Sequence, residues 1–253
     1  MHRLLCAHPQ ASGFRGTGVP EDEGQHLQDV YKAASWHGGP GRFGFDPEAH
    51  LTESTPLVTE ANRARLLDQW SRFWDMSRPV LIEKSPPNLI RARFLQAMFP
   101  NSCFVFLLRH PLAVSMATEK WQEGPLSRLI EHWLVCHKIM LDDVRHLRKS
   151  FIMRYENFVN DPDRWLGAIC DIIEVKRIPC AEPVHAGLNS EYFQSFRDRL
   201  RTRVVGNKTH RCLNNQLALR QHAASVERFG YSLVDLGTLG VLPEEYTFPA
   251  EPK

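Results

Sequence analysis

Two segments decide the fold that this sequence predicts: Val80-Leu-Ile-Glu-Lys-Ser-Pro86 and Cys103-Phe-Val-Phe-Leu-Leu-Arg-His-Pro111. The apolar residues of each segment do not alternate with polar ones, which is typical of a parallel strand covered on both faces. Between them, Asn88 to Met98 carries apolar side chains at helical spacing and ends before Pro100. The order strand, helix, strand predicts a βαβ unit and therefore a parallel sheet.

The same alternation continues on both sides of this unit. A third strand is predicted at 151–153, and Met1 to His8 resembles the end of a short helix that Pro9 stops. Loops are predicted over 9–24 and 35–50, where glycine and proline occur without periodicity. Further helices are predicted over 25–34, 59–76 with Thr59 as N-cap, 112–121, 125–148, 163–174, 190–200 and 214–229. The predicted fold class is α/β, a doubly wound parallel sheet with a helical C-terminal part.

Composition excludes several classes of function. The 253 residues contain 31 Lys and Arg against 29 Asp and Glu, a net charge of +2, which is too small a basic excess for a dedicated nucleic-acid protein. Six cysteines form no CxxC pair, which argues against a zinc ribbon or a dithiol centre. No apolar run is long enough to span a membrane, so as written the chain is expected to be cytoplasmic.

Both predicted strands of the unit end in polar groups, Lys84-Ser85 and Arg109-His110. Ligands of open parallel sheets bind beyond the carboxyl ends of the strands, so the site is expected there. Arg109 directly precedes a helix that begins at Pro111, a combination suited to phosphate or sulfate. The alternatives are that Arg109 pairs with a carboxylate and that Lys84 is simply solvated.

These segments resemble the core of PAPS-dependent sulfotransferases, in which PAPS is 3′-phosphoadenosine 5′-phosphosulfate. The resemblance rests on Glu83-Lys-Ser-Pro86, Met98-Phe-Pro100 and the Cys103–Pro111 segment, and it continues through Met153-Arg-Tyr-Glu-Asn157 and Phe229-Gly-Tyr-Ser-Leu233. It implies a P-loop-like sulfotransferase domain over 1–235 and a C-terminal tail over 236–253.

The resemblance also implies roles for individual residues. Arg109 would bind the 3′-phosphate of the nucleotide, with Ser115 or Thr118 as the second ligand, because Ala117 stands where many members have serine. Lys84 would stabilise charge on the leaving phosphate, and Ser85 beside it is a further candidate cofactor ligand. PAPS would be the co-substrate, and no metal is expected.

Transfer also needs a base for the acceptor. Glu21, Asp22 and Glu23 form an acidic segment that follows Ala7-His-Pro9 much as an acidic segment follows the first helix of some members. Glu23 is the preferred candidate because Gly24 and the next helix could fix its backbone, and Glu21 is the second. The alternative is that this acidic segment is only a solvated loop.

The resemblance also implies a missing segment. In the family a first strand and a loop rich in Ser, Gly and Thr precede a helix that runs into Leu-Leu-x-x-His-Pro, and this chain opens with Met1-His-Arg-Leu-Leu-Cys-Ala-His-Pro9. The first strand and the 5′-phosphosulfate loop are therefore expected to be absent. The glycine-rich stretches 13–18 and 38–41 do not follow a predicted strand and lack a Gly-Lys-Ser/Thr ending, so they are interpreted as turns.

Three functions therefore stay open from the sequence. The first is sulfuryl transfer from PAPS to a hydroxyl or amine of a small-molecule, carbohydrate or peptide acceptor. The second is a non-catalytic remnant that binds adenosine 3′,5′-bisphosphate or a partner. The third, a P-loop small-molecule kinase, ranks last because no Walker lysine is present. A Golgi or secretory location would require an upstream anchor.

Overall fold

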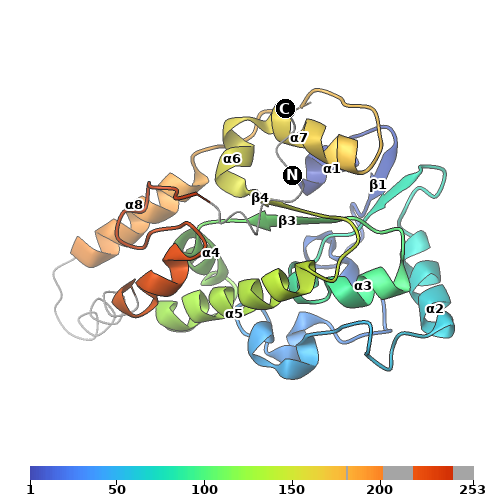
Figure 1. The fold of residues 1–253 in the computed structure, drawn as a ribbon, viewed down its shortest axis with the longest axis horizontal. Coiled ribbons are helices and arrows are strands. Elements are labelled where there is room, and N and C mark those ends of the chain that lie inside the picture. The colour runs from blue at the N-terminus through green and yellow to red at the C-terminus, as the bar shows by residue number, and fades with distance from the viewer. Residues whose placement is uncertain (181, 202–218, 242–253) are drawn as a thin grey trace.

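The computed structural model describes residues 1–180, 182–201 and 219–241. Short parallel strands and many helices make up these residues, which confirms a mixed α/β fold (Figure 1). The labelled helices are α1 (His2–Cys6), α2 (Glu60–Ser71), α3 (Ala92–Met98), α4 (Pro111–Thr118), α5 (Leu126–Val144), α6 (Tyr155–Asn160), α7 (Pro162–Ile172) and α8 (Leu188–Arg201). None of the helices in these ranges is long and apolar enough to cross a membrane.

The strands form two separate parallel pairs. β1 (Ala11–Gly13) pairs with β2 (Val80–Ile82), and β3 (Phe104–Leu108) pairs with β4 (Ser150–Arg154). Within the described ranges no backbone hydrogen bond joins β2 to β3, so the predicted single sheet is divided into two halves. The three strands predicted from the sequence, β2 to β4, are confirmed.

β1 lies in a segment predicted to be loop, and that prediction was wrong for Ala11–Gly13. Alanine, serine and glycine are poor strand formers, so this strand comes from its long-range pairing with β2 rather than from local preference. Helix α1 packs directly on it, because a Cβ atom at Gly13 would lie 2.2 Å from the sulfur of Cys6. Glycine is required here by this close approach.

Helices cover both faces of the β3–β4 pair (Figure 1). Phe106, Leu108 and Ile152 pack into a core with α4 and α5. Phe151 and Met153 belong to a second core with α6 and α7. Successive residues of a strand face opposite sides, so the unalternating apolar runs recognised in the sequence serve both cores.

The prediction of a helix over 25–34 was wrong: the 3-10 turn Gly24–His26 lies at its start, the 3-10 turn Ala34–His37 begins at its end, and residues 27–33 between them are not helical. The amide oxygen of Gln28 accepts hydrogen bonds from the backbone N–H groups of Val30 and Tyr31, and its nitrogen donates to the carbonyl oxygens of Gln25 and Tyr31. Such local side-chain bonds compete with helical hydrogen bonds and keep this segment irregular.

Other predicted helices occur with shifted bounds. Thr59 caps α2, as predicted, by accepting a hydrogen bond from the backbone of Asn62, but α2 ends at Ser71. The helix predicted over 88–98 begins with a 3-10 turn, Pro86–Ile90, before α3. α6 was not predicted and precedes α7. Residues 219–227 are helical, whereas 214–218 and residues 242–253 of the predicted tail lie outside the described residues.

Three buried histidines make the stability of this fold depend on pH. Burial lowers the pKa of His110, His132 and His137 to about 4 in each case. The neutral rings are also structural acceptors: His132 Nε2 accepts from the backbone N–H of Gly44 at 3.0 Å, and His110 Nδ1 accepts from that of Leu112 at 3.2 Å. Protonation would place a donor against a donor.

We therefore expect the free energy of unfolding to fall as the pH drops from about 6.5 to about 4, because the unfolded chain takes up protons that the folded chain excludes. Each histidine contributes up to about 1.4 kcal/mol per pH unit in that window. Urea unfolding across this range measures the slope, and His132→Gln should flatten it. The exposed His146→Gln should not, and an unchanged slope in His132→Gln would contradict the assignment.

Candidate functional site

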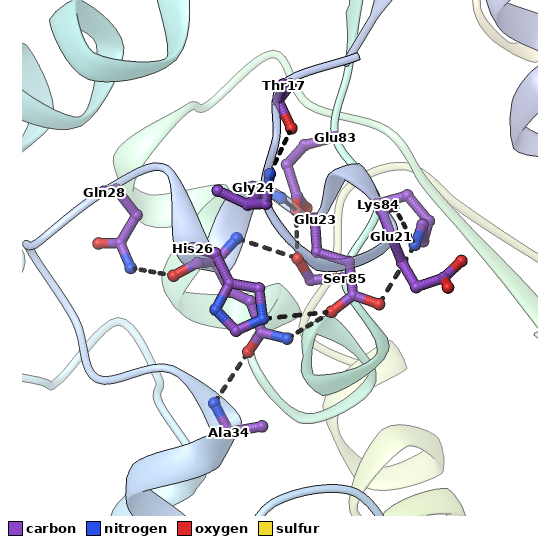
Figure 2. Close-up of polar contacts among 12 residues, drawn as sticks. Thr17, Glu21, Glu23, Gly24, His26, Gln28, Ala34, Glu83, Lys84 and Ser85 are labelled. Atoms are coloured by element: carbon purple, nitrogen blue, oxygen red, sulfur yellow. Dashed lines mark hydrogen bonds and ion pairs between the residues drawn. The ribbon is translucent and has the colours of Figure 1, made fainter. Parts of the chain in front are cut away.

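The predicted residues Lys84 and Glu23 lie in direct contact (Figure 2). The Lys84 Nζ atom lies 3.2 Å from Glu23 Oε1 and also donates to the backbone oxygen of Glu21 at 3.1 Å. Lys84 follows β2, and Glu23 belongs to the segment that follows β1. Because parallel strands end at the same edge, residues 61 positions apart meet there.

Glu23 is buried and has further polar neighbours. The Gln25 side-chain nitrogen donates to Glu23 Oε2 at 2.5 Å, and His26 Nε2 lies 3.9 Å from that oxygen (Figure 2). The Gln25 side-chain oxygen accepts from the backbone N–H of Ala34 at 2.9 Å. The carboxylate is thus held between a lysine and an amide rather than exposed in a solvated loop.

Glu21 is placed differently. Its side chain is exposed, and both Glu21 and Asp22 have positive φ, 53° and 50°. Asp22 holds this turn by accepting hydrogen bonds from Gly16 and Thr17. Glu21 therefore offers Lys84 its backbone carbonyl, while Glu23 offers a carboxylate.

The hydroxyl of Ser85 both donates and accepts a hydrogen bond within the protein. It donates to Glu83 Oε1 at 2.5 Å and accepts from the backbone N–H of Gln25 at 3.1 Å (Figure 2). The sequence singled out Ser85 as a candidate cofactor ligand, which stays a prediction. In the structure its hydroxyl joins Glu83 to the loop that carries Glu23.

Arg109 directly follows β3 and is oriented by a polar network. Its Nε atom donates to Asn189 Oδ1 at 2.8 Å, and its guanidinium carbon lies 4.4 Å from the ring centre of Tyr155 and 5.5 Å from that of Tyr192. Its Nη2 atom is buried without a hydrogen-bond partner among the described residues. Within the described part of the chain, Arg109 therefore does not form the carboxylate pair that was considered as an alternative from the sequence.

Glu156 is the centre of that network. Its carboxylate accepts hydrogen bonds from the backbone N–H of His110 at 2.9 Å, from Asn189 Nδ2 at 2.7 Å and from the Tyr231 hydroxyl at 3.0 Å. The sequence analysis assigned no role to Glu156 or Asn189. The Arg-Tyr-Glu segment was a usable signal for Glu156, because it directly follows the strand paired with β3.

The two candidate hydroxyls on α4 differ in their surroundings. Ser115 is 1% exposed, and its Oγ atom has no hydrogen-bond partner in the ranges described. Thr118 donates within the helix to the carbonyl of Val114 at 2.8 Å. Ser115 thus retains an unused polar atom in the first turns after Arg109. Among the described residues, no group of three or more His, Cys, Asp or Glu side chains could hold a metal ion.

Comparison with known proteins gives one family. A family model described as "Sulfotransferase family" matches residues 1–179. The sulfotransferase domain from the curacin biosynthetic pathway, a solved structure, is 19% identical with a TM-score of 0.37, and the match covers 66% of this chain and 75% of that one. No curated protein matches this chain.

The unpartnered Nη2 atom of Arg109 leads to a binding prediction. Adenosine 3′,5′-bisphosphate should bind, and Arg109→Ala should weaken binding by about 1.5 to 3 kcal/mol, or roughly 10- to 150-fold in Kd, because a charge-assisted hydrogen bond is lost. Isothermal calorimetry measures both constants. Ser115→Ala should also weaken binding, whereas Thr118→Val should have little effect.

Two arginine variants serve as controls. Arg109→Lys keeps the charge but not the planar fork, so its affinity should be intermediate. Arg72→Ala removes an exposed arginine at the C-terminal end of α2 that pairs with Asp68, and this variant should bind like wild type. Equal affinity of wild type and Arg109→Ala would mean that Arg109 only supports the two tyrosine rings.

Proposed function

Because the chain belongs to the sulfotransferase family, we propose that it transfers a sulfuryl group from PAPS to a hydroxyl or amine of a small-molecule, carbohydrate or peptide acceptor. The observation that carries the proposal is the 3.2 Å contact between Lys84 and Glu23 at the carboxyl edge of β1 and β2. We assign this activity to residues 1–235 as one domain.

The pair supplies the two kinds of group that sulfuryl transfer requires. As the bond between sulfur and the bridging oxygen breaks, Lys84 stabilises the negative charge that grows on that oxygen. As the acceptor oxygen or nitrogen bonds to sulfur, Glu23 takes its proton. The products are the sulfated acceptor and adenosine 3′,5′-bisphosphate, and Arg109 with Ser115 would bind the 3′-phosphate of that nucleotide.

Two features of the strand pairs, their parallel direction and the helices on both faces of β3–β4, support the finer proposal of a doubly wound, P-loop-like fold. All four strands are parallel within their pairs, and helices cover both faces of β3–β4. Lys84 follows β2 and Arg109 follows β3, and no backbone hydrogen bond joins these two strands in the part of the chain that the structure describes. We propose that these are the two halves of one sheet, which a further strand between β2 and β3 would complete together with a 5′-phosphosulfate loop.

The catalytic pair can be tested by three single substitutions. Lys84→Ala should lower turnover with only a modest change in bisphosphate affinity, because the charge it stabilises grows only as the bond breaks. Glu23→Gln should abolish transfer and leave binding intact, whereas Glu21→Gln should be mild. Turnover is measured with PAPS and a panel of sugar, phenol and peptide acceptors, and ATP in place of PAPS tests the kinase alternative.

The opposite results would change these assignments. A severe loss of turnover in Glu21→Gln together with a mild loss in Glu23→Gln would assign the role of base to Glu21. An equal loss of turnover and affinity in Lys84→Ala would make Lys84 a ground-state phosphate ligand.

The strand proposal has its own test, which also separates an enzyme from a non-catalytic remnant. The 253-residue chain is compared with a version extended at its N-terminus by a short apolar strand and a Ser-Gly-Thr loop. The extended protein should unfold at a higher temperature, because backbone groups at the edges of β2 and β3 gain partners, and should gain PAPS turnover. Both versions should bind the bisphosphate.

Full turnover and cooperative unfolding of the 253-residue chain would contradict the strand proposal. One of the glycine-rich stretches, 13–18 or 38–41, would then be the anion-binding loop. Binding without turnover in both versions would favour the non-catalytic alternative.

A further inference from the structure

Glu83, the residue before Lys84, connects the two chain segments that carry the proposed catalytic pair. Glu83 Oε1 accepts a hydrogen bond from the backbone N–H of Gly24 at 3.0 Å, and Gly24 directly follows Glu23. A single carboxylate therefore joins the neighbour of the proposed base to the neighbour of the proposed lysine (Figure 2).

Two further hydrogen bonds fix the orientation of the Glu83 carboxylate. The Ser85 hydroxyl donates to Oε1 at 2.5 Å, and the Asn88 side-chain nitrogen donates to Oε2. Burial raises the pKa of Glu83, while these donors and Lys84 act in the opposite direction. The carboxylate thus has a partner on each oxygen and is aimed at the loop rather than at solvent.

The same hydrogen-bond network also reaches the side chain of Glu23. Ser85, which Glu83 holds, accepts from the backbone N–H of Gln25 at 3.1 Å, and the side chain of Gln25 donates to Glu23 Oε2 at 2.5 Å. The backbone after Glu23 and one oxygen of its carboxylate are therefore both positioned from the end of β2.

Gly24 provides a second, independent sign of this contact. A Cβ atom at Gly24 would lie 2.6 Å from both Cγ and Oε1 of Glu83 and 2.7 Å from a ring carbon of Phe14. Any side chain at position 24 would have to push the loop away from β2. The close approach of Gly24 to Glu83 is therefore a requirement of the arrangement.

We infer that Glu83 is a positioning residue, which holds Glu23 within reach of Lys84 through the Gly24 N–H and through Ser85 and Gln25. The inference rests on the proposed function for its effect on catalysis, but the arrangement itself can be measured without activity. Glu83 acts through its acceptor atoms, because both of its links to the loop are hydrogen bonds that it accepts.

Two substitutions of Glu83 test whether its hydrogen-bond acceptor atoms are what positions the loop. Glu83→Gln keeps one oxygen for Gly24 and Ser85, and its new N–H₂ group can donate to the Asn88 side-chain oxygen, which is buried and lacks a partner among the described residues. Glu83→Ala removes both acceptors. Glu83→Gln should therefore retain kcat within about threefold, whereas Glu83→Ala should lose on the order of 10- to 100-fold, as expected for a misplaced catalytic group.

Gly24→Ala breaks the same contact from the other side and should lower kcat to a similar degree. In the double variant Glu83→Ala/Gly24→Ala the losses should not multiply, because both changes remove one interaction. The Kd for adenosine 3′,5′-bisphosphate should stay within about twofold in every variant, since Arg109 belongs to the other strand pair.

Two readouts do not depend on transfer. The amide signals of Gly24 and Gln25 in nitrogen–proton spectra should both shift in Glu83→Ala, whereas Ser85→Ala should shift mainly that of Gln25. A carbodiimide joins a carboxylate to an amine in contact with it, so it should crosslink Glu23 to Lys84 in wild type and Glu83→Gln but not in Glu83→Ala.

Matched controls separate positioning from loss of stability. Asp143→Asn changes another buried carboxylate, which accepts from His50 and contacts Arg93 far along the chain, and should lower the unfolding temperature without losing the crosslink. Gly124→Ala adds a methyl group where no atom lies within 4 Å and should behave like wild type.

An intact crosslink and unshifted Gly24 signal in Glu83→Ala would overturn the inference, as would a Glu83→Gln as inactive as Glu83→Ala. If Glu83→Ala does not fold, Gly24→Ala and the crosslink decide. If the wild-type sequence transfers no sulfuryl group to any acceptor, either as the 253-residue chain or with the N-terminal extension, the proposed function fails, whereas the amide signals and the crosslink still test the positioning.

Discussion

The parallel pairing of β1 with β2 is the constraint on which the Glu23–Lys84 contact depends. It makes the chain leave both strands at the same edge, so the turn of residues 20–26 comes to lie against residues 83–85. The pairing covers only three residues of each strand, and side chains extend it beyond the strand ends. Beyond the strand ends, the backbone N–H of Gly24 donates a hydrogen bond to Glu83, and that of Gln25 donates one to Ser85.

The parts of this architecture that the sequence could predict are those with a strong local signal. Val80 to Ile82 and Phe104 to Leu108 are apolar runs between polar ends, and Thr59 is a capping residue before a helical stripe. β1 could not be predicted, since Ala-Ser-Gly is a strand only because β2 lies beside it. Residues 25–34 misled the analysis because Gln28 satisfies nearby backbone groups and replaces helical bonds.

The residues of the candidate site also fall into those that the sequence could predict and those that it could not. Lys84 and Arg109 could be singled out because each follows a predicted strand, where ligands of open parallel sheets bind. Glu23 could be singled out because it lies in an acidic segment that resembles one in the sulfotransferase family. Asn189 could not be found, because it reaches Arg109 from α8, eighty positions along the chain. No local pattern encodes such a contact. The role of Ser85 in holding Gln25 is hidden for the same reason, since it depends on a loop that carries no regular structure signal.

Side-chain packing, rather than a continuous sheet, holds the two halves of the site together. Ala92 of α3 shares a core with Ile130 of α5 and Leu108 of β3, and Ile90 belongs to another core with Cys136 of α5. α5 therefore shares cores with both the segment that follows β2 and the strand that precedes Arg109. In the proposed reaction, a nucleotide bound at Arg109 would have to present its sulfuryl group to Lys84 within a fraction of an ångström, because misplacement by about 1 Å costs on the order of 100-fold in rate. The packing of α5 with both halves of the site would then contribute to the alignment of donor and catalytic pair.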